Sequence, residues 1–289
     1  MKKTKVTILG GAGFIGSHLS DYLTSKNYKV TIFDLKKSTW LKRGQKMIVG
    51  DILDKKKLSL AIKGSDYVFN FAALADMDTL KLRAIDTVKY NILGTVNALE
   101  ISKKHKVKKF IHSSTIYANT EEGGFYGRSK KAAEDYVEEY KNKFNLKYSI
   151  LRFGSIYGER SGSDNGIRQI LEHVIKRRKL IYKGTKNSIR SYIYVKDAVK
   201  LCLASISKKY DNQYLTLTGE RKIKAKFLFN LFSKMFKISD KNITFLKNKG
   251  HYDVKPTIFK PRIGKILHPF KSDFKKNIIQ YSKAIRKKK

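Results

Sequence analysis

A tyrosine and a lysine stand four residues apart in the stretch FYGRSKKAAEDY, at Tyr126 and Lys130. This spacing places both side chains on one face at the start of a predicted helix. A free tyrosine has a pKa of about 10 and is a poor base at neutral pH. A nearby ammonium stabilises the phenolate and lowers that pKa, so the pair is a candidate for acid/base catalysis.

Hydroxyl side chains precede this pair in the chain. The stretch IHSSTIYA closes a predicted strand and places serine and threonine hydroxyls at its C-terminal end. A tyrosine and a lysine at this spacing are common on helix surfaces, so the hydroxyls at the strand end support the catalytic interpretation. His112 lies beside them, and a histidine on a strand is more typical of packing than of catalysis.

The stretch GGAGFIGSHL predicts a dinucleotide-binding turn. It follows the β-branched run KVTIL and precedes a helical pattern of apolar residues. Glycines at 10, 13 and 16 let the backbone approach a pyrophosphate, which the helix N-terminus attracts. A tight strand-to-helix turn without a ligand also uses glycine, so further support must come from the next strand.

That support is Asp34, which closes a predicted strand 18 residues after Gly16. A carboxylate there accepts hydrogen bonds from the adenosine ribose and repels a 2′-phosphate, so NAD is preferred over NADP. Lys36 and Lys37 offset part of that repulsion. Asp51, after the apolar KMIVG, is either an adenine contact or the cap of the helix that follows.

The chain has 289 residues and a formal net charge of +39. Its lysines are scattered over nearly every predicted element, which indicates a solvated surface rather than a specific nucleic-acid site. No apolar run is long enough to span a membrane, and the first strand begins too early for a signal peptide. Cys202 is the one cysteine, which fits a reducing, cytoplasmic compartment. The histidines lack paired spacing, so no metal site is predicted.

Alternating strands and helices predict an α/β fold of the Rossmann type, a doubly wound parallel sheet with a smaller C-terminal substrate-binding lobe. We expect a dinucleotide-binding domain over 1–153, with contributions from later segments such as 190–208, and a substrate-binding lobe mainly over 154–289. Strands are predicted near 5–9, 29–34, 46–50, 66–71, 107–112 and 147–153. Later helices are predicted near 164–178, 196–208 and 223–236.

In their order and spacing, these motifs resemble the extended short-chain dehydrogenase/reductases of the NAD-dependent sugar epimerase/dehydratase family. The resemblance covers at least residues 5–200. Besides the glycine turn, Asp34 and the tyrosine–lysine pair, it rests on Asp51 with Ile52, VFNFAALA at 68–75, YNILGTVNALE at 90–100, SSTIY at 113–117, LRFGSIYGER around 152–160, and RSYIYVKDAV at 190–199.

The resemblance implies a catalytic role for three residues. Tyr126 becomes the acid/base, Lys130 its electrostatic partner and a ribose contact, and Ser113 the hydroxyl that binds the reacting sugar oxygen. Asn91 becomes a structural residue that hydrogen-bonds backbone near the cofactor. Contacts to NAD are implied for Gly10, Gly13, Phe14, Ile15, Gly16, Asp34, Asp51, Ile52, Phe71, Ala72, Ala73 and Lys130.

The resemblance also implies a nucleotide-sugar substrate. Arg190 corresponds to an arginine that grips the diphosphate, and Thr115 and Ser155 line the substrate site. Dehydratases of the family carry acidic residues where this chain has Ser114 and Thr115, and the Ser-x-Thr pattern resembles that of the 4-epimerases.

We therefore expect an NAD-dependent epimerase that oxidises the sugar transiently to a keto intermediate. The alternatives are an NAD(P)H-dependent keto-sugar reductase, a dehydratase of the same family, or a non-catalytic dinucleotide-binding sensor. In this family the helix over 126–144 commonly pairs across a homodimer interface. We therefore expect a homodimer, although the apolar stripe of Ala133, Val137, Tyr140 and Phe144 on this helix is also typical of core packing.

Overall fold

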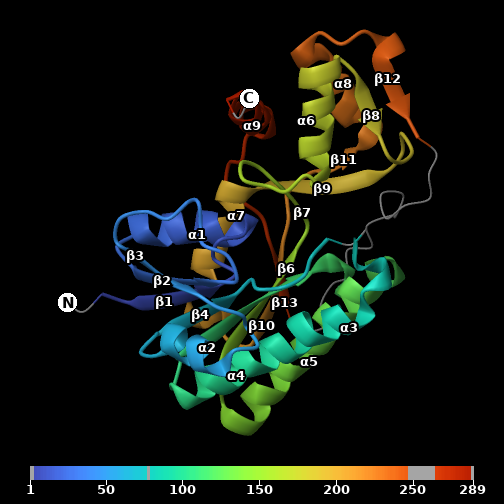
Figure 1. The fold of residues 1–289 in the computed structure, drawn as a ribbon. Helices are drawn as coiled ribbons and strands as arrows, with labels where there is room; N and C mark the ends of the chain where they lie inside the picture. Colours follow the sequence, from blue (N-terminus) through green and yellow to red (C-terminus); the bar gives the residue numbers. More distant parts are fainter. Residues whose placement is uncertain (1–2, 77–78, 247–263, 288–289) are drawn as a thin grey trace. The chain divides into compact units, whose positions relative to one another are not determined.

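The computed structural model describes residues 3–76, 79–246 and 264–287 (Figure 1). The chain forms two compact units. The first comprises the chain up to Phe153, residues 199–217 and the strand Gly264–Leu267. The second comprises Gly154–Ala198 and the described residues of the segments 218–246 and 268–287.

The first unit is built on an eight-stranded sheet in which every neighbouring pair is parallel. The order across the sheet is β13 (Gly264–Leu267), β10 (Gln213–Leu217), β6 (Tyr148–Phe153), β5 (Lys109–Thr115), β4 (Tyr67–Asn70), β1 (Lys5–Leu9), β2 (Lys29–Asp34) and β3 (Gln45–Val49). This confirms the predicted doubly wound parallel sheet. The sequence analysis did not predict β10 and β13.

Helices cover both faces of this sheet (Figure 1). Helix α1 (Phe14–Ser25) lies on one face, and α2 (Lys55–Ile62), α4 (Gly94–Lys104) and α5 (Gly124–Phe144) lie on the other. The connections include α3 (Ala84–Asp86), the π-helix η2 (Thr87–Leu93), and the short 3₁₀ turns η1 (Thr79–Leu82), η3 (Ile116–Asn119), η4 (Glu121–Gly123) and η5 (Lys208–Tyr210).

The main hydrophobic core lies between the sheet and α2, α4 and α5. Val137 and Tyr140 of α5 belong to it, and Ala133 is fully buried as well. Phe144 is 51% exposed. The apolar stripe on α5 is therefore mostly core packing, so it does not itself form a free surface for a second copy.

The second unit contains two small sheets. One has the order β11 (Lys222–Lys224), β9 (Ile189–Tyr194) and β7 (Ser155–Tyr157), and the other pairs β12 (Ile243–Phe245) with β8 (Leu180–Tyr182). Its further elements are α6 (Gly166–Arg177), α8 (Ala225–Phe236), η6 (Asp240–Asn242) and α9 (Phe274–Arg286). Helix α7 (Val195–Ala204) contains the boundary between the units. It ends at Ala204, before the predicted residue 208.

Candidate active site

Two glycines of the first turn are required by the packing of the chain itself. Gly10 has a φ of +76°, and a Cβ there would lie 2.6 Å from the amide nitrogen of Ala72. A Cβ on Gly16 would lie 2.2 Å from the Gly10 carbonyl oxygen. Gly13 is different, because the nearest atom to its Cβ would be the same oxygen at 3.3 Å. Packing of the chain therefore restricts a side chain at Gly13 less than at Gly10 or Gly16, and the contact of Gly13 with NAD stays a prediction.

The N-terminus of α1 fits a pyrophosphate. Gly13 is the N-cap residue and makes no side-chain capping hydrogen bond, and the first turn carries no acidic residue. The N–H groups of Phe14 and Ile15 in that turn have no acceptor within the helix. A helix start of this kind attracts phosphate through its free N–H groups and its dipole. The chain thus provides what the diphosphate of NAD requires.

Asp34 lies beside this turn at the end of β2. Its Oδ2 accepts from the backbone N–H of Ala12 at 2.9 Å, and its Oδ1 accepts from Lys36 N–H at 3.2 Å. A carboxylate has about four acceptor positions, so these two bonds leave capacity for ribose hydroxyls. The same bonds fix the carboxylate next to the turn. Its contact with ribose stays a prediction.

The structure decides between the two alternatives for Asp51 only in part. Helix α2 is capped by Asp54, whose side chain accepts from the N–H groups of Lys56 and Lys57 at 3.0 Å. Asp51 instead accepts from Leu53 N–H at 2.9 Å within the preceding turn. The helix-cap alternative is therefore wrong, and the adenine contact stays a prediction.

Ile52, also predicted as a cofactor contact, is 7% exposed. It packs against α4 so closely that a Cβ on Gly94 would lie 2.7 Å from its Cγ2. Its side chain therefore serves the core, and a contact with NAD stays a prediction.

The segment after β4 is held by a buried asparagine. Asn91, in the π-helix η2, accepts from Leu74 N–H at 2.8 Å and donates to the Leu74 carbonyl at 3.0 Å. It also donates to the Ser129 hydroxyl of α5 at 2.9 Å. These are the backbone hydrogen bonds expected of Asn91. They attach Leu74 to the helix that carries Lys130. Leu74 directly follows the partly exposed Phe71, Ala72 and Ala73, whose predicted contacts with NAD stay predictions.

The C-terminal end of β5 presents one available hydroxyl. Ser113 is partly exposed, and its side chain has no hydrogen bond with the described part of the chain. Thr115 is 5% exposed, and its Oγ1 accepts from Tyr117 N–H at 3.2 Å, which caps η3. The Ser113 hydroxyl therefore remains free to bind substrate, whereas the Thr115 oxygen already supports the turn.

Tyr126 lies next to this turn. The backbone of α5 approaches η3 so closely that a Cβ on Gly127 would lie 2.6 Å from the Tyr117 carbonyl oxygen. Burial, and secondarily the neighbouring Tyr117, raises the pKa of Tyr126 to about 12. The expected lowering of this pKa by Lys130 is absent from the chain alone, where burial is the main influence. Tyr126 is thus a neutral phenol at neutral pH before a cofactor binds.

Lys130 is almost fully buried. It is 1% exposed, and its Nζ donates no hydrogen bond to any residue that the structure describes. Burial lowers its pKa to about 8, although the Glu134 carboxylate opposes the shift. A buried lysine with a perturbed pKa and no hydrogen-bond partner among the described residues is typical of a functional site.

A buried ion pair that was not predicted from the sequence supports this helix. Arg152 of β6 donates from Nε and Nη2 to the two carboxylate oxygens of Glu134, at 2.8 and 2.6 Å. Asn119 of η3 has a side-chain amide that is oriented so that both its oxygen and its nitrogen have partners, and in this orientation its oxygen accepts from the same guanidinium. The sequence contains one signal for this pair, a glutamate four residues after Lys130. Its partner Arg152 could not be identified because it is remote in sequence.

The two remaining predicted substrate contacts lie in the second unit. Ser155 is partly exposed on β7, opposite Tyr192 of β9. Arg190, on β9 opposite Ile223, is 6% exposed, and its Nη1 donates to the Ile189 carbonyl at 3.0 Å. Both residues therefore belong to neighbouring strands of one small sheet. Their roles toward a substrate stay predictions.

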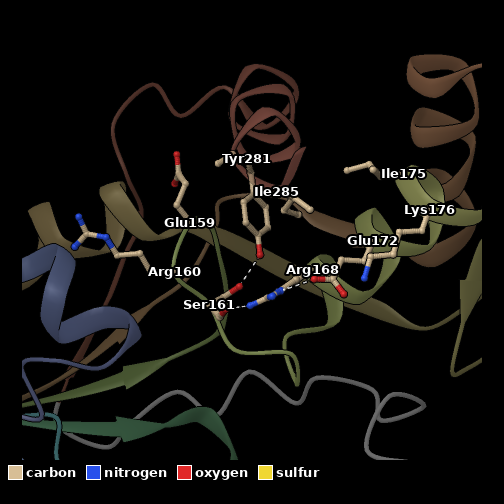
Figure 2. Close-up of a pocket in the computed structure, with 10 residues that line it drawn as sticks. Glu159, Arg160, Ser161, Arg168, Glu172, Ile175, Lys176, Tyr281 and Ile285 are labelled. Carbon is tan, nitrogen blue, oxygen red and sulfur yellow. Dashed lines mark hydrogen bonds and ion pairs between the residues drawn. The ribbon is translucent and has the colours of Figure 1, made fainter. Parts of the chain in front are cut away.

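The second unit also contains a cavity of about 180 Å³ between α6 and α9 (Figure 2). The Tyr281 hydroxyl points at Ser161, with 2.5 Å between their oxygens, and Arg168 bonds to both the Ser161 carbonyl and Glu172. These polar groups bind one another.

No group of three or more histidine, cysteine, aspartate or glutamate side chains in the described ranges is arranged to hold a metal ion. The helices of those ranges include none that is both long enough and apolar enough to cross a membrane.

A parallel sheet in this strand order, with a glycine turn opening α1 and a carboxylate closing β2, defines a dinucleotide-binding protein of the Rossmann class. The serine, tyrosine and lysine predicted to act in catalysis lie in the same unit, at β5 and α5, and their catalytic roles stay predictions.

Known proteins agree with this class. The model of the NAD dependent epimerase/dehydratase family matches residues 6–215. The structure of a UDP-glucose 4-epimerase from Thermotoga maritima, solved with UDP-glucose, superimposes with a TM-score of 0.85 at 26% identity, covering 99% of both chains. A UDP-N-acetylglucosamine 4-epimerase from Methanobrevibacter ruminantium gives 0.84 at 23% identity over the full length of both.

A dTDP-D-glucose 4,6-dehydratase from Dictyostelium discoideum is 31% identical over 237 residues, which span 68% of this chain and 54% of that protein. The chain belongs to the NAD dependent epimerase/dehydratase family, and its cofactor is NAD. This confirms the family, the fold and the cofactor expected from the sequence.

Proposed function

We propose that the protein is an epimerase that acts on a nucleotide-activated sugar by transient oxidation to a keto intermediate. The observation that carries the proposal is the combination of Ser113, Tyr126 and Lys130 in one unit, with the Ser113 hydroxyl and the Lys130 ammonium unengaged. The solved 4-epimerases that the chain resembles act on UDP-sugars, which supports this class of substrate.

The chemistry follows from these side chains. NAD, when bound, supplies the hydride acceptor and donor. The Tyr126 oxygen takes the proton of the sugar hydroxyl as that carbon is oxidised and returns it after the keto sugar has turned over. Ser113 donates a hydrogen bond to the same sugar oxygen while it has carbonyl character. Lys130, when charged, favours the phenolate form of Tyr126.

The relative from Dictyostelium makes a dehydratase the second candidate. Elimination of water needs an acid and a base close to the carbons that lose it. This chain has Ser114 and Thr115 at the corresponding positions. Ser114 is 3% exposed and Thr115 caps η3, so neither is placed to deliver a proton. This observation favours the epimerase.

The proposal extends to the substrate contacts. Arg190 would bind the diphosphate and Ser155 and Thr115 the rest of the nucleotide sugar, in line with the family motif. We also propose a cytoplasmic location, which the single, buried and free cysteine supports.

A homodimer is part of the same proposal. It is supported by exposed apolar side chains that lie outside the α5 core stripe. Two adjoining regions, η1 to η2 and α5, carry them: Leu82 (96% exposed), Ile85 (79%), Val88 (54%), Phe125 (47%) and Tyr136 (46%). An apolar surface of this kind is typical of a protein interface.

The test begins with purified protein that has received no added cofactor. Heat denaturation should release dinucleotide, identified by absorbance and NADH fluorescence. The native protein is then incubated with UDP-glucose, UDP-N-acetylglucosamine or UDP-glucuronic acid, and the products are followed by NMR. We expect one substrate to give a mixture of two epimers without net NADH formation. A requirement for stoichiometric NAD(P)H would indicate a reductase, a deoxy-keto product a dehydratase, and dinucleotide binding without turnover a sensor.

A further inference from the structure

Buried polar atoms without a hydrogen-bond partner gather at one place in the first unit. Within the described residues, the Oδ1 of Asn70, the Nε2 of His112 and the Oγ of Ser114 are buried and unpaired. The three residues are 1%, 0% and 3% exposed. Unpaired buried polar atoms are rare in native proteins, so the neighbouring His112 and Ser114 atoms require an explanation.

The sheet brings these atoms together under α5. Asn70 of β4 stands opposite His112 of β5 in the parallel register. Ser114 follows His112 by two residues, so both side chains project from the same face of the sheet. Phe110, two residues before His112, packs in the core with Val137 of α5, which identifies this face as the one that α5 covers.

The hydrogen bonds around Asn70 fix the proton on His112. The Thr95 hydroxyl donates to the Asn91 carbonyl at 2.7 Å, so its oxygen must accept from Asn70 Nδ2, which lies 3.1 Å away. The same amide nitrogen lies 3.5 Å from His112 Nδ1 and can only donate. His112 Nδ1 therefore accepts, and the imidazole proton is on Nε2. This N–H is the unpaired donor.

The charge of Lys130 acts on the same imidazole. Burial and the charge of Lys130 together hold the pKa of His112 well below its usual range, so the ring is neutral. The other charged groups nearby, Glu134 of α5 and Arg152 of β6, bind each other. The Lys130 ammonium is thus left without an acceptor among the described side chains, and an ammonium buried in that way is costly.

We propose that His112 is a positioning residue for Lys130, acting through one buried water held by His112 Nε2–H, the Ser114 hydroxyl and the Lys130 ammonium. A water has two lone pairs and two protons. Its lone pairs accept from His112 Nε2–H and from Lys130 Nζ, and one proton is donated to Ser114 Oγ. The arrangement favours the charged form of Lys130 and fixes its Nζ on the face of α5 that also bears Tyr126. The catalytic consequence rests on the proposed function, whereas the water and its effect on Lys130 do not.

Two matched variants separate the Nε2 donor from the rest of the side chain. His112→Asn keeps an amide near Asn70 and removes the donor at Nε2, while His112→Gln places an amide N–H close to the original Nε2 position. Without the water, Lys130 loses its proton at lower pH. For His112→Asn we expect the alkaline limb of the kcat–pH profile to shift to a pH about one unit lower. At a pH above that limb, kcat of the variant should then be roughly tenfold lower than that of wild type. His112→Gln should return the limb to the wild-type position. A Gln variant that behaves like the Asn variant would overturn the proposal.

A second readout does not need turnover. The unfolding midpoint of the full chain is measured from pH 6 to pH 10.5 for wild type and His112→Asn, each with and without Lys130→Met. We expect a pH-dependent effect of His112→Asn that disappears in the Lys130→Met background. An equal, pH-independent loss in both backgrounds would show that His112 only packs. If no nucleotide sugar is turned over, the proposed function fails while this cycle still decides the role of His112.

A crystal structure should show one water peak within hydrogen-bond distance of Nε2 of His112 and Nζ of Lys130, and the absence of this peak would refute the proposal.

Discussion

The guanidinium of Arg152 grips the carboxylate of Glu134 through two hydrogen bonds of 2.8 and 2.6 Å. Arg152 is 5% exposed and Glu134 is fully buried, and the guanidinium also lies 4.4 Å from the centre of the Tyr214 ring. The pair joins β6 to α5 one turn after Lys130. It thereby fixes the helix that carries both Tyr126 and Lys130.

Breaking this pair from one side should destabilise the first unit strongly. Glu134→Gln leaves the Arg152 charge buried with a neutral partner, and we expect a loss of about 3–5 kcal/mol in the free energy of unfolding. Urea denaturation measures it. A double variant, Glu134→Leu with Arg152→Met, removes both charges and should recover most of the loss. If Glu134→Gln were as stable as wild type, the Glu134–Arg152 pair would not be what fixes α5 to β6.

The glycine turn allows folding and cofactor binding to be separated. A methyl group at Gly16 would lie 2.2 Å from the Gly10 carbonyl oxygen, whereas at Gly13 the same distance is 3.3 Å. Gly16→Ala should therefore unfold or severely destabilise the protein. Gly13→Ala should keep its melting temperature within a few degrees and lose most of the bound NAD, because the methyl occupies the room left for the diphosphate. Full NAD content in purified Gly13→Ala would contradict this assignment.

Burial of Lys130 makes a pH-dependent contribution to stability. Its pKa is about 8 in the folded protein and 10.5 as the reference value, so below pH 8 the buried charge opposes folding. Between pH 8 and 10.5 the folded state binds fewer protons than the unfolded state, and stability rises with pH. In protein freed of NAD, Lys130→Met should stabilise at pH 7 by up to about 3 kcal/mol, and the gain should fade toward pH 10.5. The exposed Lys143 on the same helix provides the control, since Lys143→Met should show no such pH dependence. A gain that is constant with pH would refute the assignment.

Arg190 tests whether the substrate carries a diphosphate. Losing a charge-assisted bidentate contact costs about 2–5 kcal/mol, so Arg190→Ala should raise KM for the nucleotide sugar about thirtyfold or more with little change in NAD content. Because Arg190 is 6% exposed, the melting temperature of the Arg190→Ala variant must be compared with that of wild type. Arg190→Lys is a further variant, which keeps the positive charge but lacks the bidentate guanidinium. The exposed Arg221 serves as the control position. An unchanged KM would mean that no diphosphate binds at Arg190.

The sequence predicts the dinucleotide-binding part of this fold well because its signals are local. The glycine turn, Asp34 and the β-branched runs each occupy a few adjacent residues. Strands β10 and β13 escape prediction because β10 joins the sheet through pairing with β6, more than 60 residues earlier in the chain, and β13 joins it only through pairing with β10.

The candidate site shows the same division. Tyr126, Lys130 and Ser113 stand in recognisable patterns. The Glu134–Arg152 pair and the unpaired His112 depend on which residues the folded sheet places opposite each other. The pKa of Tyr126 also depended on burial, which the spacing of Tyr126 and Lys130 does not reveal.

The central claim is that Tyr126 moves the proton during epimerisation of a nucleotide sugar. The most direct measurement compares kcat of wild type and Tyr126→Phe on the sugar identified by NMR, together with the NAD content of each preparation. Loss of a catalytic acid/base lowers the rate about 10²–10⁴-fold. For Tyr126→Phe we therefore predict a kcat reduced by at least about 10²-fold, with NAD still bound and the melting temperature maintained. A Tyr126→Phe variant that interconverts the two epimers at close to the wild-type rate would contradict the account.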